Sequence, residues 1–167
     1  ETVSVLICTY NYARFLSQCL ETVCDQTRPP DEVIVVDDGS EDDTAEVLRR
    51  FPEVRYIRQN HEGKSAAFNR AVRESHGDIL CHLDADDFWM PTKLEQVCRE
   101  LQQRPSIGGV IHETLHVGEN GQPIQFPYAT APFPESTVLT CDGVEEVGFL
   151  YPLPSARGLM AGNPNTV

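Results

Sequence analysis

The chain has 167 residues, of which 40% are hydrophobic and 23% are charged, a balance typical of a globular domain rather than a disordered one. Its formal net charge of −13 argues against nucleic acid or an anionic membrane as a partner, because both are bound mainly through lysine and arginine. We find no signal-peptide pattern and no apolar run near the roughly 20 residues of a membrane-spanning helix, so we expect no membrane span in this chain. The chain opens abruptly at Glu1, and we expect it to be a piece of a longer protein.

Residues 1–104 alternate between strand patterns and helix patterns. Short, β-branched apolar runs predict strands at residues 3–8, 32–38, 54–59 and 78–84. Apolar stripes at helical spacing predict helices that include residues 15–24, 67–72 and 94–101. Ser40 and Asp43 have the spacing of a capping box, which predicts that a further helix starts at Ser40. This alternation predicts an α/β fold with a mostly parallel sheet flanked by helices.

Residues 105–167 have a different texture, and we expect them to be a truncated extension of the same domain. Asn120-Gly121 is a strong two-residue turn signal, so it predicts a β-hairpin. The stretch from Pro123 to Pro164 is rich in proline, glycine and threonine and has weak periodicity, which predicts an irregular C-terminal extension. The predicted organisation is therefore an α/β core at 1–104 and an extension at 105–167.

The six cysteines indicate a reducing compartment. They form no C-x-x-C pair, and most of them lie in apolar stretches. We expect them to be reduced and buried, since an unpaired cysteine is among the most buried residue types. This predicts a cytoplasmic location, with any membrane association supplied by parts of the full-length protein outside this chain.

Polar residues follow three of the predicted strands. In an open parallel sheet the carboxyl ends of the strands share one edge, and ligands bind in the crevice outside that edge. We therefore expect one crevice to collect the residues after these strands: Thr9, Tyr10, Asn11, Asp37, Asp38, Asp84, Asp86 and Asp87.

The Asp-x-Asp at the end of the last strand predicts a metal site. Asp84, Asp86 and Asp87 repel one another unless a cation or several N–H donors stabilise their ionised forms. Mg²⁺ or Mn²⁺ binds to one or two carboxylates and completes its coordination with water and phosphate oxygens. We therefore expect a divalent ion that bridges to a diphosphate, with Lys64 as a second positive contact.

Four stretches of the sequence resemble one known family. They are "VSVLICTYN", "QTRPPDEVIVVDDGSEDDT", "NHEGKSAAFNRAV" and "GDILCHLDADDFWMPTKLEQ". In this order and spacing they resemble the family-2 inverting glycosyltransferases of GT-A (Rossmann-like) fold, over about residues 3–104. The resemblance implies metal-dependent transfer of a sugar from a nucleotide diphosphate sugar, most often a UDP-sugar, to an acceptor hydroxyl with inversion. The acceptor, whether carbohydrate, lipid-linked or protein, stays open.

The resemblance also implies how the base and ribose of the nucleotide are held. The segment from Thr9 through Tyr10 to Asn11, together with Asp38, would bind this half of the donor. Tyr10 would lie against the uracil ring. Asp38 would accept a hydrogen bond from the ring N–H of the base.

The phosphate half of the donor is implied to lie beside the Asp-x-Asp motif. Asp84 would sit near the ribose, Asp86 would ligate the Mn²⁺ or Mg²⁺ ion, and Asp87 would lie beside it. Gly63 and Lys64 match the "N-x-x-G-K" stretch, which runs close to the donor in this family.

The catalytic base is not assigned. Inverting transfer needs a general base for the acceptor hydroxyl, and in this family that base is an Asp or Glu well beyond the metal loop. Asp142, Glu145 and Glu146 are the acidic residues that come late enough after Glu135, but their surroundings do not match. We therefore expect this chain to carry the donor-binding half of the enzyme, and a non-catalytic nucleotide-sugar-binding module is the alternative.

A second motif keeps a remote alternative open. His112-Glu113-x-x-His116 has the spacing of a zinc metalloprotease site, which works only on a helix. Gly108-Gly109 before the motif and Asn120-Gly121 after it favour a strand, where the two histidines would be about 13 Å apart. A helical apolar stripe also fits this segment.

Overall fold

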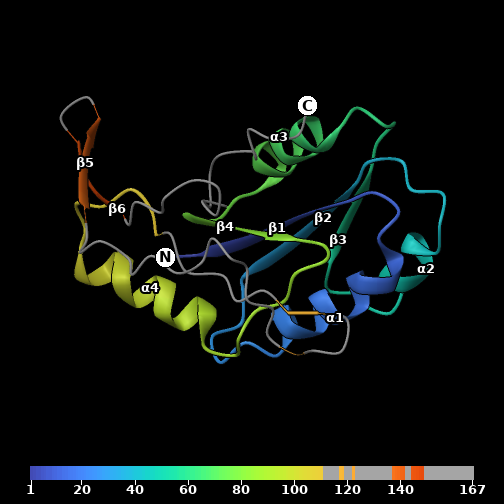
Figure 1. The fold of residues 1–167 in the computed structure, drawn as a ribbon, viewed down its shortest axis with the longest axis horizontal. Helices are drawn as coiled ribbons and strands as arrows, with labels where there is room; N and C mark the ends of the chain where they lie inside the picture. Colours follow the sequence, from blue (N-terminus) through green and yellow to red (C-terminus); the bar gives the residue numbers. More distant parts are fainter. Residues whose placement is uncertain (111–116, 119–121, 123–136, 142–143, 149–167) are drawn as a thin grey trace. The chain divides into compact units, whose positions relative to one another are not determined.

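A four-stranded parallel sheet forms the centre of residues 1–96 (Figure 1). The computed structural model describes residues 1–110, 117–118, 122, 137–141 and 144–148. The strands follow the order β3 (Arg55–Arg58), β2 (Glu32–Asp37), β1 (Val3–Thr9) and β4 (Ile79–Asp84), and each neighbouring pair is parallel. The four predicted strands are confirmed, and β3 lies at one edge of the sheet.

Helices follow the strands in alternation, as predicted. They are α1 (Ala13–Cys24), α2 (Thr44–Leu48), α3 (Lys64–Glu74) and α4 (Lys93–Gln103). Figure 1 shows α1 and α3 on opposite faces of the sheet. Every residue of β1 is buried, because this strand lies between β2 and β4 and has a helix on each face.

Alternate residues of the central strands point to the two helices. On one face, Leu6 and Ile34 pack against Ala67 and Ala71, whose small side chains let α3 approach the sheet closely. On α1 the apolar stripe predicted at helical spacing is buried: Leu16, Cys19, Leu20 and Val23. Each large apolar side chain that is fully buried stabilises the fold by about 1.5–3 kcal/mol relative to its exposed state.

The second helix starts later than the capping pattern predicts. It begins at Thr44, and the predicted start at Ser40 is wrong. The backbone N–H and the hydroxyl of Thr44 both donate to Oδ1 of Asp42, at 3.1 and 2.6 Å. Ser40 instead accepts a hydrogen bond from the N–H of Asn11 at 2.9 Å. Ser40 therefore takes part in a contact between two loops and does not cap the helix. Local spacing in the sequence does not reveal such a contact.

Residues 97–167 form a separate unit, in which β5 (Thr137–Cys141) and β6 (Val144–Gly148) pair antiparallel. The sequence predicts an irregular path here, so this hairpin is a departure from the expectation. The two residues between the strands are Asp142-Gly143, a turn signal that weak periodicity in the flanks had obscured. The predicted turn at Asn120-Gly121 lies outside the described residues. The domain limits at 1–104 and 105–167 stay a prediction.

Most of the described cysteine side chains are buried, as predicted. Cys8, Cys19, Cys81 and Cys98 lie in the interior, and none of them is in a disulfide. Cys24 is the exception, since it is exposed at the end of α1. In the part of the chain that the structure describes, no helix combines the length and apolar character needed to cross a membrane.

The turn before β4 packs closely on β1 at Gly77, and a substitution there tests this contact. A Cβ atom at this position would lie 2.6 Å from both the N and the Oγ of Ser4, and the backbone of Ser4 is fixed within the sheet. We expect Gly77→Ala to lower the free energy of unfolding by about 1–3 kcal/mol, as overpacking does. Gly109→Ala is the control, because a Cβ there meets nothing within 4 Å. Equal urea midpoints for the two variants would contradict this close approach.

Candidate functional site

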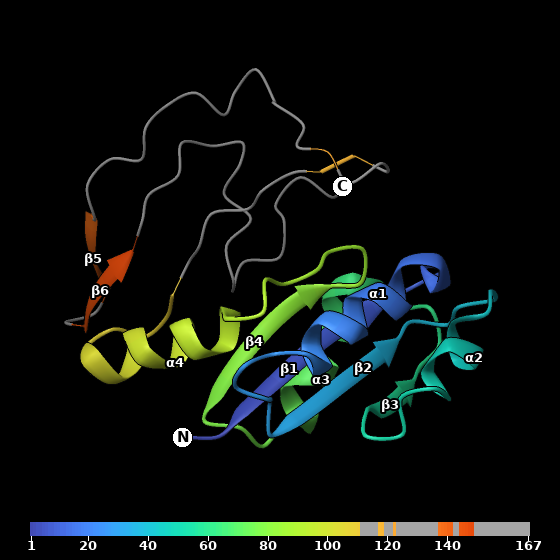
Figure 2. The same ribbon diagram turned by 90° about the horizontal axis from the view of Figure 1, so that it is seen from below.

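The carboxyl ends of three strands lie at one edge of the sheet (Figure 2). The pairs Thr9↔Asp37 and Cys8↔Asp84 bring the ends of β2 and β4 level with the end of β1. The N–H of Asp38 continues the ladder by donating to the carbonyl of Thr9 at 2.9 Å. The convergence that the parallel sheet predicts is therefore present.

Asp38 is a buried carboxylate held by its own chain. The residue is 3% exposed, and its Oδ1 accepts from Nε2 of Gln59 at 2.7 Å and from the N–H of Glu62 at 2.9 Å. Its Oδ2 accepts from the N–H of Gly63 at 2.8 Å. Burial alone would raise the pKa of Asp38, but these hydrogen bonds and the nearby His61 outweigh it and hold the pKa below the ordinary value. Asp38 is therefore ionised at neutral pH.

Asp37 is also buried, but it serves a different purpose. It is 0% exposed, and it accepts hydrogen bonds from the N–H of Ser40 at 2.7 Å, the hydroxyl of Tyr56 at 2.8 Å and the guanidinium of Arg58 at 3.0 Å. These contacts tie the end of β2 to β3. Asp37 is therefore a structural group of the strand end.

Gly63 forms the start of α3. Its φ of +93° lies in the region that favours glycine, although a Cβ there would meet nothing within 4 Å. The requirement for glycine is thus conformational rather than steric. The turn aims the Gly63 N–H at Asp38 and places Lys64 as the first residue of the helix.

Thr9 and Tyr10 line the end of β1. The hydroxyl of Thr9 is buried and has no hydrogen-bond partner. Tyr10 is 39% exposed, and its ring stacks on the imidazole of His61 with a centroid distance of 4.0 Å and an interplanar angle of 24°. Tyr10 therefore offers an aromatic surface beside Asp38, and His61 covers part of it.

Asn11 links two loops of the site edge. Its φ is 57°, in the left-handed region that asparagine tolerates better than most residues. Its N–H donates to Oγ of Ser40 at 2.9 Å, and its Oδ1 accepts from the N–H of Glu41 at 2.8 Å. The Asn11 side chain thus holds the loop after β1 against the loop after β2.

The end of β4 carries the Asp-x-Asp motif. Nζ of Lys64 lies 2.6 Å from Oδ1 of Asp84, and Nε2 of His82 lies 3.4 Å from the same oxygen. Burial lowers the pKa of His82, so this imidazole is neutral at neutral pH. Asp86 is exposed, and the N–H of Asp87 donates to the carbonyl of Asp84 at 3.0 Å to close the turn.

The thiol of Cys8 lies within reach of the charges of Asp38, Lys64 and Asp84. Burial raises the pKa of this thiol to about 12, the positive charge of Lys64 opposes the rise, and the negative charges of Asp84 and Asp38 add to it. Cys8 sits on β1 between β2 and β4, so both carboxylates act on one point of the central strand. Contacts at the start of α3 link the two strand ends, since the N–H of Gly63 donates to Asp38 and Nζ of Lys64 pairs with Asp84.

The sequence matches the family described as glycosyl transferase family 2 over residues 4–150. This chain belongs to that family. It is 35% identical over 127 residues to an uncharacterized glycosyltransferase of Nostoc sp., which covers 73% of this chain and 39% of the relative. It is 34% identical over 130 residues to chondroitin synthase of Escherichia coli, which covers 75% of this chain and 19% of the relative.

The solved structure of a mannosyltransferase has a similar fold. The mannosyltransferase PcManGT from Pyrobaculum calidifontis, in complex with GDP-Man and Mn²⁺, is 32% identical and has a TM-score of 0.58, covering 65% of this chain and 34% of that one. This likeness and the parallel sheet confirm the predicted GT-A fold class. The chain spans well under half the length of each of these three proteins.

The donor atoms of this family-2 chain fit a hard divalent ion only in part. Among the residues that the structure describes, no three His, Cys, Asp or Glu side chains are grouped closely enough to hold a metal by themselves. Asp84 and Asp86 offer carboxylate oxygens at one turn, and Mg²⁺ and Mn²⁺ can complete such a pair with phosphate oxygens and water. The site therefore fits an ion that arrives with a phosphate ligand better than an ion bound alone.

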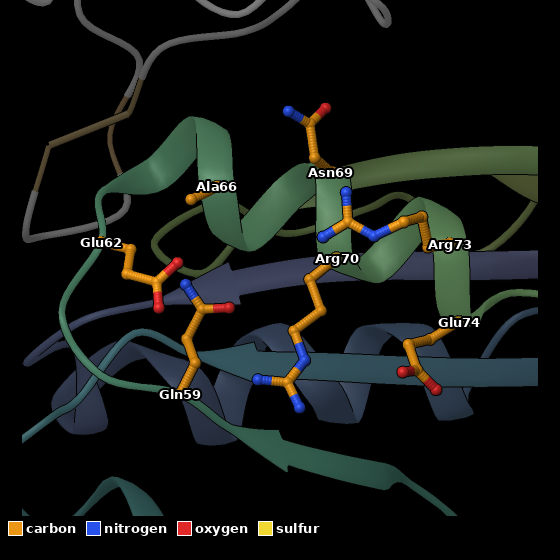
Figure 3. A pocket seen from close by; sticks show the side chains of 7 residues that line it. All are labelled: Gln59, Glu62, Ala66, Asn69, Arg70, Arg73 and Glu74. Carbon is orange, nitrogen blue, oxygen red and sulfur yellow. The ribbon is translucent and has the colours of Figure 1, made fainter.

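A polar pocket of about 510 Å³ lies beside α3 (Figure 3). The residues that line it are Gln59, Glu62, Ala66, Asn69, Arg70, Arg73 and Glu74. The lining does not include Tyr10, Lys64 or Asp84 of the strand-end site, and the pocket lies next to that site. Gln59 and Glu62 connect the two, since both donate to Asp38.

Sequence reasoning missed Gln59 and His61. Both lie between β3 and α3 and contact Asp38. Gln59 lies just before the "NHEGKSAAFNRAV" stretch, and His61 lies within it at a position to which the resemblance assigns no role. The available signal was their position, directly after the end of a strand that neighbours β2. A polar residue just after the end of β3 lies close to the residues at the end of β2, because the two strands are paired.

The network around Asp38 predicts a specific pH dependence. Because the pKa of Asp38 is lower in the folded chain than in the unfolded one, its contribution to stability is present above about pH 4 and is lost as the pH falls through the folded pKa. Asp38→Asn leaves the Gly63 N–H without a proper acceptor, and we expect it to lower the free energy of unfolding by about 1–3 kcal/mol at pH 7. Urea unfolding of both proteins from pH 7 to pH 3 should show this difference shrinking towards acid.

Asp25→Asn is the control for that series. Asp25 is an exposed residue after α1, so its substitution should change stability by less than about 0.5 kcal/mol at each pH. A loss in Asp38→Asn that stays constant from pH 7 to pH 3 would contradict the depressed pKa.

Proposed function

We propose that this chain is the donor-binding part of an inverting glycosyltransferase that transfers a sugar from a UDP-sugar to an acceptor hydroxyl. The observation that carries the proposal is a chain of contacts at the strand ends: Tyr10 and Asp38 both contact His61, Asp38 accepts from the N–H of Gly63, and the next residue, Lys64, pairs with Asp84. Family membership supports sugar transfer as the reaction class. The full reaction belongs to a longer protein, since this chain spans 39% of its Nostoc relative.

The β1 and β2 ends fit the base half of the donor. Tyr10 presents a partly exposed aromatic ring, on which a planar base can stack. Asp38 is an ionised acceptor beside that ring, and a base with a ring N–H can donate to it. Uracil and guanine both have a flat ring and such an N–H, and the resemblance to a family that most often uses UDP-sugars favours uridine.

The β4 end and α3 fit the diphosphate half. The side chain of Lys64 is partly exposed, and its Nζ can contact a phosphate oxygen. Asp86 is exposed to solvent. When bound, Mn²⁺ or Mg²⁺ at Asp84 and Asp86 would neutralise the charge that develops on the departing diphosphate. The mannosyltransferase from Pyrobaculum calidifontis, captured with GDP-Man and Mn²⁺, supports this use of a metal by similarity.

In this proposal, the acceptor is bound by parts of the full-length protein outside this chain. The late acidic residues Asp142, Glu145 and Glu146 have no described side chains, and neither do His112, Glu113 and His116 of the zinc-protease pattern. No residue described in the structure is assigned as the general base. This chain therefore binds, orients and partly desolvates the donor.

Metal dependence is the sharpest test of the proposal. We expect UDP to bind at least about tenfold more tightly with Mn²⁺ or Mg²⁺ than with EDTA, because the ion bridges the diphosphate to the Asp-x-Asp turn. Asp86→Ala should remove most of that difference. Isothermal titration calorimetry with UDP, and with GDP for comparison, measures it directly.

The control variant is Asp25→Ala, which changes an exposed carboxylate outside the site. It should keep the metal dependence of the unmodified protein. Equal UDP affinity with Mn²⁺ and with EDTA would overturn the metal-dependent proposal. Binding of UDP without any turnover of UDP-sugars by the full-length protein would favour a non-catalytic module.

A further inference from the structure

His61 makes the two contacts that the proposed function assigns to a nucleobase. Its ring stacks on Tyr10 at 4.0 Å and 24°. Its Nδ1 lies 3.1 Å from the main-chain oxygen of Asp38 and 3.0 Å from Oδ2 of the same residue. Both neighbours are acceptors, so the ring proton resides on Nδ1. The imidazole is thus a flat ring with an in-plane N–H directed at Asp38, as uracil would be.

The acceptor positions of Asp38 are nearly filled by the protein itself. An ionised carboxylate has about four lone-pair positions. Gln59 and Glu62 take two of them at Oδ1, and Gly63 takes one at Oδ2. The remaining position at Oδ2 faces His61. A base that donates to Asp38 must therefore displace the imidazole.

The His61 side chain can leave without opening the core. It is 58% exposed, in the loop between β3 and α3. Its backbone is packed on Gly39, where a Cβ would lie 3.1 Å from the N of His61 at a φ of +87°. The loop is therefore held in place while the imidazole is free to rotate about its side-chain bonds towards solvent.

We propose that His61 competes with the nucleobase for Tyr10 and Asp38, so that the base site is closed by the protein's own imidazole until a nucleotide displaces it. This inference rests on the proposed function, because it places the base at Tyr10 and Asp38. Its consequence is that the apparent affinity for a nucleotide equals the intrinsic affinity reduced by the fraction of molecules in which His61 is displaced. A base therefore binds only if its stacking on Tyr10 and its hydrogen bond to Asp38 outweigh the same contacts of His61.

Titration calorimetry of His61→Ala with UDP and Mn²⁺ tests the competition. We expect UDP to bind about tenfold more tightly than to the unmodified protein, which corresponds to a site open in roughly one-tenth of molecules. Pyrophosphate has no base, so its affinity should not change. His76→Ala is the matched control, since His76 is an exposed histidine paired with Glu32 away from the site, and it should leave UDP binding unchanged.

His61→Phe separates the ring from its N–H. Phenylalanine keeps an aromatic ring against Tyr10 but leaves the Asp38 position open, so UDP should bind more tightly than to the unmodified protein and less tightly than to His61→Ala. Weaker or unchanged UDP binding by His61→Ala would overturn the competition and make His61 a wall of the base site. An equal gain in His61→Phe would also overturn it. Failure of UDP to bind either the unmodified protein or His61→Ala would instead reject the proposed function.

Discussion

The buried carboxylate of Asp38 is the interaction on which the site edge depends. It gathers an amide side chain and two backbone N–H groups from the stretch between β3 and α3, all within 2.9 Å. A charge with so little exposure persists only because these donors replace the water that it has lost. The start of α3, and with it the position of Lys64, is therefore fixed by the end of β2. The end of β2 and the first turn of α3 are joined through one side chain.

The main elements of the fold could be predicted from the sequence because its patterns are local. The run "VSVLIC" is buried along its whole length, as continuous β-branched runs in a two-sided parallel sheet should be. The stripe from Leu16 to Val23 reads at helical period and is buried on one side of α1. Where the outcome depended on a distant partner, the local pattern gave the wrong answer. Ser40 bonds to the loop after β1, and the thiol of the exposed Cys24 donates to Glu53 at 3.2 Å.

The candidate site shows the same division between local and distant information. The strand ends at Thr9, Asp38 and Asp84 follow from topology alone, since parallel strands bring their carboxyl ends together. The saturation of Asp38 does not follow, because it depends on the path of residues 59–63 after β3. Likewise, the direct ion pair of Lys64 with Asp84 needs the helix to start at a glycine with positive φ. The motifs indicated which strand ends form the candidate site, whereas the contacts between its residues depend on backbone geometry.

The edge strand β3 has a consequence for how the protein behaves at high concentration. An unpaired strand edge is a template on which a second molecule can add a strand and begin to aggregate. Here the edge is only four residues long and carries Arg55 and Arg58, which are held by Glu74 and Asp37. A short edge that carries charged side chains is a poor template for a second strand, because these groups would lose their water on contact. The same arginines that brace the sheet therefore also make its β3 edge less suited to strand addition.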